Sequence, residues 1–168
     1  MADLVTHLCT VLLPGALIPH RATGLAAIGV VLPDALGRVV PMALELAQQA
    51  GTGIPDEFVW AFGAFHSPVG ILLANATLSQ SFQRGLRNEA FVALTLGGAL
   101  HLLLDVTQFH HGHGYPLLAP VSWQTFELGI LSSEATVALA LPLLGVTALA
   151  WAVRGYLSSR RRRRSDLA

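Results

Sequence analysis

Long apolar runs separated by short polar segments divide this chain into candidate membrane-spanning helices. The clearest run covers residues 135–153, whose 19 positions hold no charged side chain and come close to the roughly 20 residues that cross a bilayer as a helix. Runs of similar length cover residues 58–78 and 90–109, each with only one or two strongly polar side chains. The pattern therefore predicts an all-α, polytopic membrane helical bundle with three clear spans.

The N-terminal part of the chain carries two shorter apolar segments. Residues 4–18 are interrupted by Pro14 and Gly15, and residues 22–32 comprise only 11 positions. At 1.5 Å per residue, neither segment comfortably crosses a hydrocarbon core about 30 Å thick. We therefore expect one or two N-terminal apolar helices, arranged as a tilted hairpin or as re-entrant half-helices. An external loop is expected to follow over residues 34–57.

The composition supports a membrane protein. Of the 168 residues, 53% are hydrophobic and 12% charged, whereas a typical soluble domain carries about 25% charged residues. The mean hydropathy is +0.58. The length fits one domain, and the single cysteine, Cys9, excludes both an internal disulfide and a Cys-x-x-Cys metal site.

The basic residues are distributed unevenly, although the net charge is zero. There is no lysine, and six of the ten arginines fall within residues 154–164. The positive-inside rule places this end of the chain, and the arginine-bearing segment 79–89, on the cytoplasmic side. Because the arginine run follows a span directly, we interpret it as an anchor to anionic lipid and expect no nucleic-acid partner. We expect one membrane domain over residues 1–157 and a basic cytoplasmic tail over residues 158–168.

An ionisable pair lies inside the third predicted span. His101 and Asp105 are four residues apart, so a helix presents them on one face. Such a pair inside an apolar helix is costly and is by default a functional-site hypothesis. Imidazole and carboxylate are also ligands that zinc and related divalent metals use. The pair therefore predicts a metal site, with an ordinary hydrogen-bonded His–Asp pair as the alternative.

The expected topology brings further candidate ligands to the depth of that pair. Taken singly, each has a simpler explanation, such as a solvated terminal histidine, a helix-ending aspartate or a surface histidine. Together they lie toward the outer side of the membrane, with His66 in the outer half of its span and His7 at the same level if residues 4–18 begin outside. Chance placement would spread them over both faces. The predicted metal ligands are His7, Asp34, His66, His101, Asp105 and His111.

Five short motifs follow one another in a recognisable order. They are Thr6-His7, Pro33-Asp34, His66-Ser67, a Gly-x-x-x-His-x-x-x-Asp helix from Gly97 to Asp105, and a Gly-x-Pro-Leu-Leu-x-Pro-x-Ser turn from Gly114 to Ser122. In this order the chain resembles the YdjM-type membrane-bound metal-dependent hydrolases over roughly residues 6–122. It departs from them just before His66, where a histidine and an arginine of the family's block are absent. The spacing of His101, Asp105 and His111 is also distantly similar to that in zinc-dependent phospholipase C and the S1/P1-type nucleases.

The resemblance implies a hydrolase that activates water with a divalent metal, zinc first and manganese as the alternative. A phosphoester is the expected bond, and a membrane lipid headgroup the most accessible substrate. His101, Asp105 and Asp34 are the expected catalytic residues. We expect a bacterial inner or plasma membrane, with the site on its external side. Two alternatives are a non-enzymatic protein that binds or transports a divalent metal, and a degenerate relative whose polar residues serve helix packing.

Overall fold

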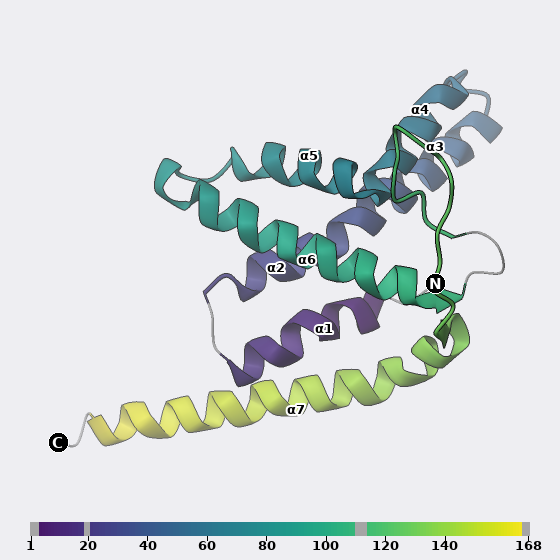
Figure 1. Ribbon diagram of the computed structural model, residues 1–168. Helices are drawn as coiled ribbons and strands as arrows, with labels where there is room; N and C mark the ends of the chain where they lie inside the picture. The colour runs from purple at the N-terminus through teal and green to yellow at the C-terminus, as the bar shows by residue number, and fades with distance from the viewer. Residues whose placement is uncertain (1–3, 19–20, 110–113, 166–168) are drawn as a thin grey trace.

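The computed structural model describes residues 4–18, 21–109 and 114–165, and most of them are helical (Figure 1). A short parallel pair joins β1 (Gln108–Phe109) to β2 (Leu131–Ser132). The helical elements are α1 (Leu4–Leu17), α2 (Thr23–Asp34), the π-helix η1 (Ala35–Val39), α3 (Val40–Gln49), α4 (Asp56–Gly63), the 3-10 turn η2 (Ala64–His66), α5 (Pro68–Ser79), the 3-10 turn η3 (Arg84–Leu86), α6 (Arg87–Thr107) and α7 (Ser133–Ser165).

Three of the described helical stretches are long and apolar enough to cross a membrane: Thr23–Gln49, Arg84–Thr107 and Glu134–Arg160. The last two contain most of the spans predicted at 90–109 and 135–153. Figure 1 shows α7 extending well beyond the rest of the bundle, and its helix continues without a break to Ser165, into the segment expected to form the tail.

The Thr23–Gln49 stretch corrects the prediction for the N-terminal part. The prediction of a loop from residue 34 onward is wrong as far as Gln49, because α2 continues through η1 into α3. The predicted apolar segment ends at residue 32, before Pro33-Asp34. Apolar residues nevertheless recur every four positions at Leu36, Val40 and Leu44, which is helical spacing, and α3 packs against α4.

The span predicted at 58–78 is broken near its middle, as in a broken span or a re-entrant loop. Its two halves, Asp56–His66 and Pro68–Ser79, are bent by 89°. Ser67 has an extended backbone, as the residue before a proline prefers, and its Oγ accepts a hydrogen bond from the Gly70 amide at 3.2 Å. A Cβ at Gly70 would lie 2.2 Å from the Ala64 carbonyl oxygen. Glycine therefore permits the close turn that ends η2 at His66.

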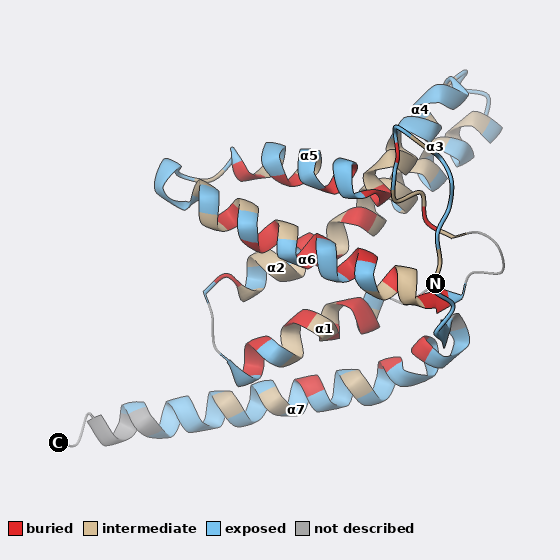
Figure 2. Cartoon of the chain, in the orientation of Figure 1, coloured by how far each residue is buried: buried red, intermediate tan, exposed pale blue. Residues whose placement is uncertain are grey.

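The α2–α6 interface forms the centre of the bundle. A Cβ at Gly29 would lie 2.1 Å from the Leu94 carbonyl oxygen, and one at Gly97 would lie 2.0 Å from that of Ala26. Small residues let membrane helices approach this closely. Figure 2 shows buried positions along α6, whereas α7, which packs against α1, is largely exposed. The tight interface positions the C-terminal end of α2 beside the last turns of α6.

Candidate metal centre

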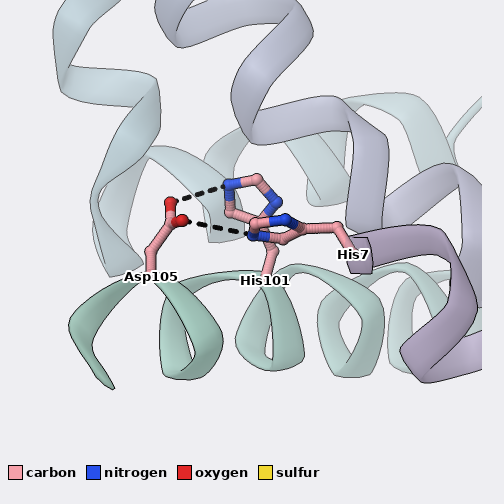
Figure 3. Close-up of side chains that lie close together, drawn as sticks. All are labelled: His7, His101 and Asp105. Carbon is pink, nitrogen blue, oxygen red and sulfur yellow. Dashed lines mark ion pairs between the residues drawn. The ribbon is translucent and has the colours of Figure 1, made fainter. Parts of the chain in front are cut away.

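Four helical elements bring histidine and aspartate side chains together at one end of the bundle. α1 supplies His7, η2 supplies His66, α6 supplies His101 and Asp105, and the last residue of α2 supplies Asp34. The three histidines and Asp105 are at most 5% exposed. Figure 3 shows His7 and His101 with their imidazoles directed at the Asp105 carboxylate.

The Asp105 carboxylate is the centre of this cluster. Its Oδ2 lies 2.7 Å from His66 Nε2 and 3.1 Å from His101 Nε2, and its Oδ1 lies 3.2 Å from His7 Nε2. The Nε2 atoms of His66 and His101 are themselves 3.2 Å apart. Three imidazole nitrogens and one carboxylate therefore face one small volume.

These separations resemble those within a metal coordination sphere. With metal–nitrogen distances of 2.0–2.1 Å, two ligand atoms in a tetrahedral site lie about 3.3 Å apart. The 3.1–3.2 Å contacts of His7, His101 and His66 are close to that value, while the 2.7 Å contact of His66 with Asp105 is a short hydrogen bond. Two residue groups could hold an ion, His7–His101–Asp105 and Asp34–His66–His101.

Several polar atoms of the cluster lack hydrogen bonds in the described part of the chain. They include Oδ1 of Asp34, Oδ1 of Asp105, and Nδ1 of both His66 and His101. Both Oδ1 atoms are buried, with a histidine Nε2 at 3.9 Å from Asp34 and at 3.2 Å from Asp105. A buried polar atom left without a hydrogen bond costs about 1–3 kcal/mol, and more when charged. A cation among these oxygens would offset that cost, so the donor set fits a metal.

Asp34 differs from the other acid because its side chain is 15% exposed. Its Oδ1 lies 3.9 Å from His101 Nε2 and 3.3 Å from Arg38 Nε. Arg38 Nη2 also donates a 2.6 Å hydrogen bond to the Tyr115 hydroxyl. The Tyr115 ring stacks on His66, with centroids 4.9 Å apart and planes at 20°. Arg38 and Tyr115 thus border the cluster on its Asp34 side.

The sequence analysis missed both Arg38 and Tyr115. Arg38 follows Asp34 by four residues, which is the helical ion-pair spacing, but the segment had been assigned to a loop. Tyr115 lies inside the recognised turn motif, directly after Gly114. Burial raises the pKa of the Tyr115 hydroxyl above its usual value, and the negative charge of Asp105 adds to this rise. Tyr115 therefore stays protonated as a hydrogen-bonding partner at neutral pH.

The π-helix η1 brings these groups close to η2. Isolated π-helical turns are rare and frequently mark functional sites. A Cβ at Gly37 would lie 3.0 Å from His66 Cβ and 3.2 Å from His66 Nδ1. The absence of a side chain at Gly37 thus lets the His66 ring enter between η1 and α6.

The structure brings together five of the six predicted ligands, His7, Asp34, His66, His101 and Asp105. The sixth, His111, lies outside the described residues. Comparisons of the chain with protein-family models, curated proteins and solved structures found no match.

Proposed function

We propose that this protein binds one divalent metal ion, zinc first and manganese as the alternative, and uses it to hydrolyse a phosphoester at the membrane boundary. The observation that carries the proposal is the convergence of three histidine Nε2 atoms on Asp105, at 2.7–3.2 Å. The contacts of His101 with both aspartates use its Nε2. One histidine nitrogen binds one metal ion at a time. The two possible ligand groups both include His101, so they cannot both hold an ion through its Nε2, and this favours a single ion.

The chain's own residues suit this chemistry. A divalent ion here would polarise a phosphoryl oxygen and lower the pKa of water. His7, His66, His101 and Asp105 would hold the ion. Asp34 is the more exposed of the two acids. We propose that it acts as the general base, accepting the proton that water loses as it attacks phosphorus. The proton then passes to the alcohol oxygen as the old phosphorus–oxygen bond breaks. The motif order shared with the YdjM-type hydrolases supports the same assignment.

A lipid headgroup is the substrate that the position of the cluster favours. The cluster lies where α5 begins and α6 ends, away from the Arg21–Glu89 ion pair at the other end of the bundle (N–O distance 2.6 Å). Three apolar helices suit a membrane, and the uneven arginines favour a cytoplasmic C-terminal end with the cluster on the external side. A lipid phosphoester of the external leaflet would then be the substrate nearest to the cluster. We assign the protein to a bacterial inner or plasma membrane.

A second candidate is a protein that binds the metal without catalysis. Structural zinc sites are typically closed by four protein ligands, whereas catalytic sites keep one position open. Here three histidine Nε2 atoms already lie within 3.2 Å of the Asp105 carboxylate, so the proposed ligands number four. Catalysis therefore requires either that one of them leaves the metal or that the coordination number rises to five.

Metal analysis of the protein purified in detergent without chelator tests the proposal. We expect about one zinc or manganese per chain, with hydrolysis of a generic phosphodiester such as bis(p-nitrophenyl) phosphate. His101→Ala should lose both the metal and the activity, whereas the control Arg21→Ala, in the ion pair at the other end of the bundle, should keep both. Absence of metal from the wild-type protein would refute the proposal. Stoichiometric metal without hydrolysis across a phosphoester panel would support the non-enzymatic candidate.

A further inference from the structure

The cluster has one side that is less buried than the rest. Side-chain exposure is 1% for His7, 0% for His101 and 1% for Asp105, but 15% for Asp34 and 25% for Arg38. A substrate therefore approaches the cluster past Asp34 and Arg38. Arg38 lies inside the span-length helix Thr23–Gln49, where a charged side chain is expensive and usually serves a function.

The guanidinium of Arg38 is held in place by two neighbours, but not all of its N–H donors are used in hydrogen bonds or ion pairs within the described residues. Its Nε lies 3.3 Å from Asp34 Oδ1, and Nη2 donates to the Tyr115 hydroxyl at 2.6 Å. A guanidinium carries five N–H donors, so three have no partner in the described part of the chain. Tyr115 is itself fixed by its stacking on His66. Arg38 is thus oriented by two neighbours, with donors left for a ligand.

The net charge of the cluster with a divalent cation bound also favours binding of an anion. Asp34 and Asp105 contribute two negative charges, Arg38 contributes one positive charge, and the histidines are neutral as ligands. One divalent cation then leaves a net charge of plus one in a poorly hydrated site. Charges are screened weakly in such surroundings, and an isolated buried charge is strongly unfavourable. An incoming anion would neutralise the cluster.

We propose that Arg38 binds an anionic phosphoryl oxygen of the substrate at the entrance to the cluster. This inference rests on the proposed function and names the chemical group that the site selects. Guanidinium groups hold phosphoryl oxygens through paired, charge-assisted hydrogen bonds, which an ammonium does not reproduce. The phosphoryl group of a lipid headgroup and free phosphate share this chemistry.

Calorimetric titration of the zinc-loaded protein in detergent with inorganic phosphate tests the inference without turnover. Arg38→Met removes the charge and keeps much of the side-chain length. Arg38→Lys keeps the charge but loses the planar guanidinium group with its paired N–H donors. We expect an unchanged zinc content in both, phosphate affinity at least tenfold weaker in Arg38→Met, and an intermediate value in Arg38→Lys. Arg154→Met is the matched control, because Arg154 donates to the Gly15 carbonyl oxygen at 2.8 Å, away from the cluster, and its phosphate affinity should equal that of the wild type.

Each contrary result has a separate meaning. Equal phosphate affinities in the wild type and Arg38→Met would overturn the inference alone. Loss of zinc from Arg38→Met would also overturn it, because Arg38 would then act by maintaining the structure of the cluster and not by binding substrate. Failure of the wild type to take up metal would overturn the proposed function as well. A parallel titration with a short-chain phosphatidic acid distinguishes the sources: tighter binding than phosphate assigns a lipid headgroup, and equal binding assigns the phosphoryl group by itself.

Discussion

Replacing Gly97 with alanine should separate α2 from α6 and weaken metal binding without touching a ligand. The added Cβ would lie 2.0 Å from the Ala26 carbonyl oxygen and 2.8 Å from the Val30 amide nitrogen. Both atoms are backbone, so no side chain can rotate away. Ordinary contact distances are about 3.5 Å, so relieving the 2.0 Å contact requires roughly 1.5 Å of helix separation. Overpacking of this kind typically costs about 1–3 kcal/mol.

The same displacement reaches the cluster within one helical turn. His101 follows Gly97 by four residues on α6, and Asp34 follows Val30 by four on α2, about 6 Å along each axis. Metal–ligand distances are normally kept within about 0.2 Å. A separation several times larger should lower zinc affinity by about 10–100-fold, the range seen when groups supporting a metal ligand are lost.

Zinc affinity and thermal unfolding in detergent, measured on one preparation, test this reasoning. Gly24→Ala is the matched control. Gly24 lies on α2, the helix that packs against Gly97, and a Cβ there would meet no heavy atom within 4 Å. The control should bind zinc like the wild type and be no less stable. Wild-type zinc affinity and stability in Gly97→Ala would refute the link between the α2–α6 contact and the metal centre.

Two further predictions concern α7 and the topology. Arg154 donates to the Gly15 carbonyl oxygen at 2.8 Å, and Trp151 Nε1 donates to that of Leu12 at 3.0 Å. Because the last carbonyls of α1 lack partners within the helix, Arg154→Met should cost about 1–3 kcal/mol in thermal unfolding while zinc content stays constant. An unchanged melting temperature would contradict this role of Arg154. Reporters fused after Ala168 and inserted within residues 124–133 should label opposite sides of the membrane, and labelling on one side would disprove the proposed topology.

Much of the candidate site could be predicted from the sequence because two patterns point to the same place. They are the spacing of residues along a helix and the alternation of apolar runs with polar segments. Helical spacing puts His101 and Asp105 on one face, and the expected topology places His7, Asp34 and His66 toward the same side of the membrane. Membrane helices cross in alternating directions, so ends at one depth meet in space. The structure confirms that these five side chains meet; whether they bind a metal stays a prediction.

The remaining features depend on tertiary contacts or on local signals that hydropathy does not register. Arg38 joins the site only because α2 continues through the π-helix η1. Tyr115 reaches His66 from a segment distant in sequence, for which helical periodicity has no rule. The bend at Ser67 was locally encoded, since serine before proline is a common helix start. An average of hydropathy over residues 58–78 conceals that start.

The cluster draws on segments that the ribosome makes far apart in time. His101 follows His7 by 94 positions, a delay of roughly 5–20 s at 5–20 residues per second. The principal packing partner of α1 is α7, which is synthesised after α6. During that interval α1 carries His7 without α6 or α7 beside it. α1 therefore reaches its final position only after α7 has been made, and the histidine–aspartate cluster can be completed only after α6 has been synthesised.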